Sequence, residues 1–446
     1  MDTGTLAGQA RLLIEHIETP DRLVGAALDK AKASTGVFIS LMEEAALAEA
    51  AAATRRRSAG VALSDFDGIP FAVKDLFDVA GSVTSAGSRT RLAVPTAPRD
   101  SAIVANLRKL GMIPIGKTNL SEFAFSGLGL NPHFGTPTAS GREDRVPGGS
   151  SSGSAIAVQR GIVPVALGTD TAGSVRVPAA FNGIAGFRPS RGRYDMRGVY
   201  PLAASFDTAG LLAKNAEDCV VMDALMRGVA PANTAAPRRF IIERSMLDDP
   251  ELEPAVGQNL LAFAGLLRSG GGLVEPRVMP SIGRARAAIG KFGWPGGVEA
   301  ATLHRGLLAS NERALIDPRV VARLDIAAAT PVENMIALRR IRTGLIRALR
   351  HELDGAILIL PTVPHVAPLL APLASNDELF ARLNLRTLSM TMIGSFLDMP
   401  GLAVASGTDP QGLPTSVLLT GATGFDDAVL AAGRLVLRVH GADSFS

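Results

Sequence analysis

The sequence has one cysteine, almost no net charge and no long uninterrupted hydrophobic run, and each of these shortages excludes a class of protein. Because Cys219 is the single cysteine among 446 residues, an intramolecular disulfide and a zinc site built on several cysteines are both excluded. Lysine and arginine number 45 against 42 aspartates and glutamates, so the formal net charge of +3 does not indicate a nucleic-acid partner. A reducing compartment is the simplest interpretation.

The most apolar stretch of the chain does not resemble a membrane span. Residues 356–374 contain four prolines, a density that a membrane-spanning helix does not tolerate. The N-terminal residues have neither a basic region nor a cleavage site of small residues, so they do not resemble a secretory signal. We therefore expect a cytoplasmic protein without a membrane partner.

What the sequence does contain is typical of a globular α/β protein. Hydrophobic residues make up 47% and charged residues 20%, which excludes disorder. Short apolar runs separated by glycine-rich loops alternate with helical segments, and this alternation predicts a sheet covered by helices on both faces. The predicted strands lie at 71–73, 112–115, 163–167, 184–187, 240–242, 356–360, 402–405 and 417–419, and the predicted helices at 102–110, 155–160, 253–268, 333–350 and 426–438.

No repeat, low-complexity linker or composition shift marks a domain boundary. Residues 7–57 read as helices, since Pro20 follows Thr19 as a first-turn proline follows a cap and the later part is rich in alanine. We expect one domain over residues 1–446, with a helical arm at 1–60 and a catalytic α/β core at 61–446. The loop-rich stretch 190–235 leaves two lobes as an alternative.

Two short motifs match known catalytic patterns in their letters only. Gly111–Thr118 fits a phosphate-binding loop, but a helical segment precedes it and its interior reads as a strand, so we reject this interpretation. Gly149–Gly153 fits a nucleophile elbow centred on Ser151, which also requires a later acid and histidine. Only His365 lies in a suitable loop, because His304 and His351 have the polar helical contexts of surface residues.

Three other segments resemble the amidase signature family. They are Asp67–Asp75, the glycine- and serine-rich Gly148–Ser154, and Gly168–Gly183. Residues 116–124, 186–190 and 412–421 also resemble the family, so that the similarity extends over roughly residues 40 to 440. The resemblance implies a single large mixed β-sheet with helices on both faces.

The same resemblance implies a Ser-Ser-Lys triad. Ser174 matches the nucleophile, Ser150 matches the bridging serine that follows a cis peptide bond, and Lys74 matches the general base. A lysine can serve as a base only if burial and its neighbours keep it neutral near pH 7.

The family also implies an oxyanion hole and supporting residues. The backbone N–H groups of Thr171, Ala172, Gly173 and Ser174 would form the oxyanion hole. Ala172 stands where many members have glycine, so its backbone must avoid positive φ or accept some strain. Ser151 is expected to support the lysine or to cap a helix, and Asp170 is expected either to support the triad or only to close a local turn. For Arg176, a structural salt bridge is favoured over binding of a substrate carboxylate, and residues that select the substrate are not predicted.

These expectations describe an amidohydrolase that acts on a small-molecule amide through an acyl-enzyme on Ser174, releases ammonia or an amine, and uses no metal or organic cofactor. Two related activities remain as alternatives: an A-type subunit of a tRNA-dependent amidotransferase, which depends on partner subunits, and a hydrolase of urea derivatives similar to allophanate hydrolases, which share Thr171–Ser174 and the triple serine. An inactive scaffold is disfavoured because all triad positions are intact. Whether the chain forms a homodimer is left open.

Overall fold

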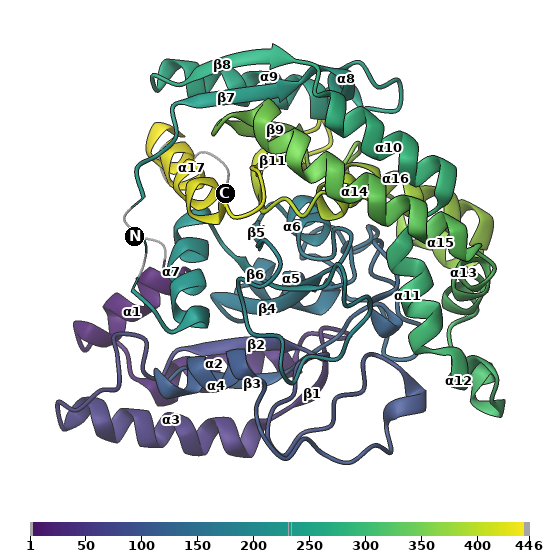
Figure 1. The fold of residues 1–446 in the computed structure, drawn as a ribbon. Coiled ribbons are helices and arrows are strands. Elements are labelled where there is room, and N and C mark those ends of the chain that lie inside the picture. Colours follow the sequence, from purple (N-terminus) through teal and green to yellow (C-terminus); the bar gives the residue numbers. More distant parts are fainter. Residues whose placement is uncertain (1–2, 231, 233, 441–446) are drawn as a thin grey trace.

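An 11-stranded β-sheet runs through the molecule (Figure 1). The computed structural model describes residues 3–230, 232 and 234–440. The strands lie side by side in the order β1-β3-β2-β4-β6-β5-β10-β11-β9-β7-β8. Their bounds are β1 Phe38–Leu41, β2 Pro70–Lys74, β3 Ile113–Thr118, β4 Val165–Asp170, β5 Ala185–Arg188, β6 Thr208–Ala213, β7 Arg239–Glu243, β8 Leu273–Arg277, β9 Ile357–Pro361, β10 Gly401–Thr408 and β11 Pro414–Thr420.

The sheet is mixed, as expected. Strand β2 lies between its parallel neighbours β3 and β4, and β7 lies between its parallel neighbours β8 and β9. The remaining neighbours are antiparallel. The parallel trio β3-β2-β4 matters most for function, because the carboxyl ends of parallel strands meet at one edge and commonly carry the site of an α/β fold.

Helices cover both faces of the sheet. Neighbouring residues of a strand point to opposite faces, and in β10 Gly401 lies against Arg176 of α6 whereas Leu402 lies against Gly433 of α17. Helix α7 packs beside α17, and α5 packs beside α6. The helices are α1 Leu6–Ile14, α2 Pro20–Lys32, α3 Glu43–Ser58, α4 Ala102–Lys109, α5 Ser152–Gln159, α6 Arg176–Asn182, α7 Ala216–Arg227, α8 Arg244–Leu247, α9 Pro254–Ser269, α10 Pro280–Phe292, α11 Pro295–Leu303, α12 Arg305–Leu308, α13 Pro318–Ala328, α14 Val332–Leu353, α15 Leu370–Ser375, α16 Asp377–Phe396 and α17 Asp426–His440, with 3-10 turns η1 Arg89–Arg91, η2 Glu122–Ala124 and η3 Asn311–Leu315.

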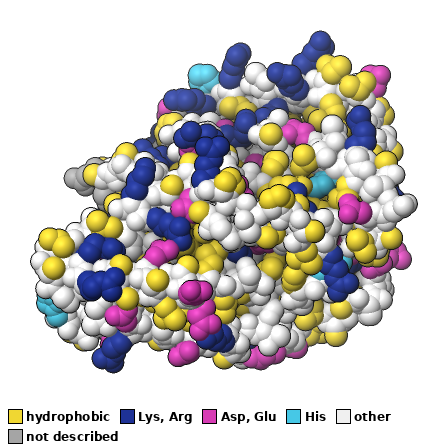
Figure 2. Space-filling model, turned by 90° about the horizontal axis from the view of Figure 1, so that it is seen from below, with side chains coloured by type: hydrophobic (Ala, Val, Ile, Leu, Met, Phe, Trp, Pro, Cys, Tyr) yellow, Lys and Arg dark blue, Asp and Glu magenta, His cyan; other side chains and the backbone are white. Residues whose placement is uncertain are grey.

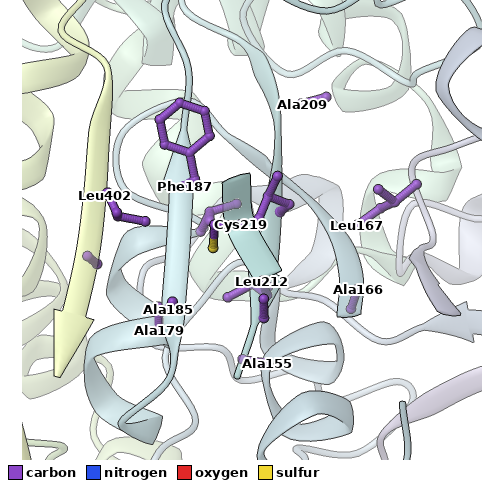
Figure 3. Packing of buried hydrophobic residues seen from close by; sticks show 14 of the residues in the cluster. Ala155, Ala166, Leu167, Ala179, Ala185, Phe187, Ala209, Leu212, Cys219 and Leu402 are labelled. Carbon is purple, nitrogen blue, oxygen red and sulfur yellow. The ribbon is translucent and has the colours of Figure 1, made fainter. Parts of the chain in front are cut away.

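Small residues let helices approach the centre of the sheet closely. A Cβ at Gly186 of β5 would lie 2.6 Å from the Cβ of Ala179 in α6, so only glycine fits there. On the other face, Cys219 of α7 is buried in the hydrophobic cluster that contains Phe187 and Leu402 (Figure 3). The cysteine therefore belongs to the core, as its apolar surroundings in the sequence indicate.

The surface agrees with the balanced charge of the sequence, because side chains of both signs are interspersed over the face seen in Figure 2. Among the described residues, no helix combines the length and the apolar composition that a bilayer crossing requires. The loop-rich stretch 190–235 contains β6, a strand of the same sheet as the rest of the chain, and α7, which packs against β5 and β6. The division into an arm at 1–60 and a core at 61–446 stays a prediction.

Candidate active site

The predicted triad residues come together where β2 and β4 end. Lys74 is the last residue of β2, and the loop that follows β4 carries Ser174. A third segment, the turn before α5, brings Ser150 and Ser151 to the same place. The amide N–H of Ser151 donates to the carbonyl oxygen of Ser174 over 3.2 Å, which ties the two serine loops together. The peptide bond between Gly149 and Ser150 is cis.

Lys74 is fully buried and is surrounded by hydroxyl groups. Its Nζ lies 2.8 Å from Oγ of Ser150, 2.9 Å from Oγ of Ser151 and 2.9 Å from Oγ1 of Thr169. Among the described residues, no carboxylate forms an ion pair with this lysine. Burial lowers the pKa of Lys74 to about 7, and the more distant charges of Asp170 and Asp207 oppose this shift without cancelling it. A substantial fraction of Lys74 is therefore neutral at pH 7.

The loop between β4 and α6 presents unused hydrogen-bond donors. The backbone N–H groups of Thr171, Ala172, Gly173 and Ser174 donate to no other described residue. Ala172 lies outside the positive-φ region, which meets the condition derived from the sequence, whereas Gly173 has a φ of +144°. Unpaired amides beside a serine hydroxyl can stabilise the negative oxygen of a tetrahedral intermediate.

Replacing Gly173 by alanine should disturb this loop. The added Cβ would lie 2.2 Å from Oγ1 of Thr391, in a backbone conformation that L-residues avoid. We expect kcat for amide hydrolysis to fall by up to about 10²-fold, the scale for losing one oxyanion donor. Ala172→Gly is the matched control and should retain most of the activity. Equal rates for both variants in steady-state assays would contradict this role of the loop.

Asp170 contacts the same loop through a backbone hydrogen bond and forms a buried ion pair. Its Oδ1 lies 2.8 Å from Nη2 of Arg176 and 3.6 Å from Nε of Arg188, and its Oδ2 accepts from the amide of Val175 over 3.2 Å. These cations and the amide hold the pKa of Asp170 below its usual range despite burial. Arg176 also donates to the carbonyl oxygen of Thr391 over 3.1 Å. Arg176 thus forms a structural ion pair, and the role of Asp170 in supporting the triad stays a prediction.

The two motifs that matched only in their letters have structural roles. Lys117 is buried in β3 and pairs with Asp75 over 2.7 Å, so it is unavailable to a phosphate. Ser151 of the apparent elbow contacts Lys74 and donates to the carbonyl oxygen of Thr169 over 3.3 Å. Its hydroxyl therefore lies against the lysine, and its supporting role in catalysis stays a prediction.

His365, His304 and His351 do not contact the triad serines. The ring nitrogens of His365 contact the carbonyl oxygen of Val366 and Oγ1 of Thr387, over 2.8 and 3.0 Å. Burial lowers the pKa of His365 to about 4. His351 is exposed as expected. The expectation that His304 is a surface residue is wrong: it is buried, because the aromatic rings of Phe123 and Tyr200 pack against it, with ring centres 4.3 and 6.4 Å away.

A small pocket with a cavity volume of about 30 Å³ opens onto Ser174. Thr171 and Ala172 share its wall with Ser174, and the facing walls combine apolar side chains with Arg323 of α13. The apolar contributors are Ala124, Phe125, Leu202, Trp294, Leu388 and Met392. The sequence did not point to these residues, which come from four distant segments, nor to Thr169, the third hydroxyl at Lys74. Among the described residues, no group of three or more histidines, cysteines or carboxylates could hold a metal ion.

Known proteins share both this sequence pattern and this fold. The family model described as Amidase matches residues 22–430. A 2-amino-5-chloromuconic acid deaminase from Comamonas testosteroni is 33% identical over 81% of this chain and 79% of its own length. A mandelamide hydrolase from Pseudomonas putida is 30% identical over 97% of this chain and 91% of its own. A solved structure described as an amidase superposes with a TM-score of 0.87 at 31% identity, over 97% of this chain and 99% of that one.

Proposed function

This chain belongs to the amidase family, and we propose that it cleaves its amide through an acyl-enzyme on Ser174. It is an amidohydrolase that acts on carbon–nitrogen bonds other than peptide bonds. The observation that carries the proposed mechanism is the buried Lys74, whose Nζ lies 2.8 Å from Oγ of Ser150 and whose pKa is lowered to about 7. A neutral lysine at this position can accept a proton that a serine passes to it.

In the proposed acylation step, Oγ of Ser174 attacks the carbonyl carbon of the substrate. Ser150 accepts the proton of Ser174 and passes its own proton to Nζ of Lys74. The amides of Thr171–Ser174 hold the negative oxygen of the tetrahedral intermediate. The C–N bond then breaks, and the leaving ammonia or amine takes up the proton that Lys74 returns through Ser150.

In the proposed second step, water hydrolyses the acyl-enzyme. The water attacks the ester carbonyl carbon of the acyl group on Ser174 and gives its proton to Lys74 through Ser150. Ser174 regains a proton by the reverse of the relay, and the carboxylic acid leaves. Every proton that Lys74 accepts is returned within one turnover, so this sequence needs no cofactor.

The substrate is a small-molecule amide, and assays of ammonia or amine release over a panel of such amides will test the proposal. Activity that disappears in Ser174→Ala is the expected result. An A-type amidotransferase subunit would instead favour glutamine and require partner subunits, and a hydrolase of urea derivatives would favour allophanate over carboxamides. Product release in the purified chain alone separates the first alternative from the main proposal. We also propose a cytoplasmic location, and gel filtration tests whether a homodimer forms.

The rate should depend on pH through Lys74. The working form of the base is neutral, so protonation at low pH removes it. With the pKa lowered to about 7, kcat/KM should reach a plateau above pH 8 and fall about tenfold for each pH unit below 7. A profile of kcat/KM from pH 5 to 9 checks this expectation. A base of pKa near 10 would instead leave the rate still rising steeply at pH 9.

A further inference from the structure

One side chain of α16 contacts the backbone of the loop that carries Ser174. Thr391 is buried, and its Oγ1 donates to the carbonyl oxygen of Ala172 over 2.7 Å. No other group among the described residues donates to this carbonyl oxygen. The helix is held beside the loop, because Arg176 donates to the carbonyl oxygen of Thr391 over 3.1 Å and to Oγ of Ser395 over 2.8 Å. Buried groups on both sides therefore fix the contact between Thr391 and the loop.

The peptide unit that Thr391 holds also carries one of the unused hydrogen-bond donors. A trans peptide unit is planar, and its C=O and N–H point in opposite directions. The carbonyl oxygen of Ala172 and the N–H of Gly173 belong to one such unit, since the bond between Gly149 and Ser150 is the only cis peptide bond among the described residues. The carbonyl oxygen faces Oγ1 of Thr391, so the N–H of Gly173 points away from it and donates to no other described residue. Thr391 thus determines where this donor points.

Glycine at position 173 leaves this peptide unit free to turn over unless a hydrogen bond holds it. The next unit is held by the backbone, because the carbonyl oxygen of Gly173 accepts from the amide of Val177 over 2.8 Å at the start of α6. Turning over the unit between Ala172 and Gly173 would change φ of Gly173 from +144° to a negative value, which glycine also adopts readily. The N–H would then point toward α16 and be lost to the reaction. The hydroxyl of Thr391 opposes this rotation, because its hydrogen bond would break.

We infer that Thr391 is a positioning residue for the oxyanion hole, whose hydroxyl keeps the N–H of Gly173 directed at the oxygen of the tetrahedral intermediate. This inference rests on the proposed function, because it assumes that the reacting carbonyl group lies at Ser174. A hydrogen bond to the carbonyl oxygen also polarises the peptide unit and strengthens its N–H as a donor. The donor acts on charge that develops in the transition state, so its loss should lower kcat more than it raises KM.

The first experiment compares the kinetics of Thr391→Val, which loses the hydroxyl and nearly keeps the shape, with those of Thr391→Ser, which keeps the hydroxyl. The substrate is an amide whose cleavage depends on Ser174. Thr391→Val should lower kcat about 10- to 100-fold and leave KM close to wild type, because one oxyanion donor is misdirected for part of the time rather than removed. Thr391→Ser should recover most of the rate.

Thr387→Val is the matched control. Thr387 is also buried and lies one turn earlier in α16, where its Oγ1 donates to the carbonyl oxygen of Leu383 over 2.7 Å and forms no hydrogen bond with residues 171–174. Its replacement should leave kcat as in wild type. The pH at which kcat/KM falls should be the same in all these variants, since none of them displaces Lys74. A shift of this pH in Thr391→Val would place the effect on the base instead of the oxyanion hole and contradict the inference.

The second experiment measures inhibition by a trifluoromethyl ketone that carries the acyl group of the same amide. Oγ of Ser174 forms a bond to the ketone carbon, the π electron pair of the carbonyl group moves to its oxygen, and the proton of Ser174 passes through Ser150 to Lys74. The adduct therefore carries the negative oxygen of the intermediate. In Thr391→Val the inhibition constant of the ketone should rise by about the factor by which kcat/KM falls. The corresponding alcohol cannot form the adduct, and its inhibition constant should not change.

Wild-type kcat and wild-type inhibition by the ketone in Thr391→Val would overturn the inference. Equal losses in Thr391→Val and Thr391→Ser, or a similar loss in Thr387→Val, would also overturn it, because they indicate a general disturbance of α16. Thr391→Cys, whose S–H is a weak donor, replaces Thr391→Val if that variant does not fold, and should show a smaller loss of kcat. Absence of both Ser174-dependent turnover and a ketone adduct on Ser174 in the wild type would overturn the proposed function itself.

Discussion

Replacing Ser174 by alanine should lower kcat/KM for amide hydrolysis by about 10⁴- to 10⁶-fold, the scale for removing a catalytic nucleophile. Without Oγ, no acyl-enzyme forms. The remaining hydrolysis must come from direct attack of water on the amide, assisted only by the loop amides and the pocket. The fold should not change, because the hydroxyl lies at the pocket wall and alanine fits in its place. Steady-state kinetics with circular dichroism and thermal unfolding measure both effects.

Ser152→Ala is the matched control for this variant. Ser152 lies two residues after Ser150 and is equally buried, but its Oγ has no hydrogen-bond partner among the described residues. Its replacement should leave activity and stability close to wild type. Mass spectrometry of the wild type after treatment with a fluorophosphonate should find the adduct on Ser174. An adduct on Ser151 would instead support the nucleophile-elbow interpretation.

Replacing Lys74 by arginine should lower kcat/KM by about 10²- to 10⁴-fold, the usual contribution of a positioned acid–base group. Arginine keeps the charge and approximate length of lysine but stays protonated at all working pH values, so it cannot accept the proton of Ser150. Lys74→Ala removes the base entirely and should be at least as slow. Rates near wild type for Lys74→Arg would mean that this position only supplies positive charge.

Measurements of stability should distinguish the role of Lys74 from that of Lys117, the other buried lysine among the described residues. Lys74 has no ion-pair partner among the described residues and is partly neutral in the fold, although an exposed lysine is protonated up to about pH 10.5. Folding therefore loses a proton between pH 7 and 10, which lowers stability there relative to high pH. Lys74→Met should not destabilise the protein at pH 7. Lys117→Met leaves Asp75 buried without its partner and should cost about 3–5 kcal/mol of unfolding free energy.

The sequence was most informative where backbone pattern and chemistry coincide. The eight predicted strands correspond to β2, β3, β4, β5, β7, β9, β10 and β11, because these strands are short apolar runs bounded by glycine or proline. The sequence did not predict the other three strands, β1, β6 and β8. β1 has only four residues, and β8 is largely exposed and contains Pro276, so neither has a clear buried pattern. β6 is fully buried, but it lies in a stretch of sequence dominated by loop-forming residues, which hid it.

Some residues of the site could likewise be predicted from the sequence, and others could not. The serine loops and Lys74 stand in contiguous motifs, so their grouping could be predicted, although their roles in catalysis stay predictions. Thr169, Arg323 and Thr391 could not be found, because each acts across segments that only the tertiary structure brings together. Arg323 in particular lies in an ordinary amphipathic helix, where an arginine has no local mark of its environment. His304 was misjudged for the opposite reason, since polar neighbours in sequence did not reveal the aromatic rings that cover it.

One face of α16 serves two purposes. Leu388 and Met392 line the pocket, whereas Oγ1 of Thr391, between them, donates to the carbonyl oxygen of Ala172 over 2.7 Å, and Oγ of Ser395 accepts from Arg176 over 2.8 Å. A change that reshapes the pocket on this helix therefore also shifts the backbone amides that act on the reaction. Substitutions in α16 that adapt the pocket to a new substrate should therefore also lower the catalytic rate. Trp294, which lines the same pocket from the start of α11, offers a second route to new selectivity.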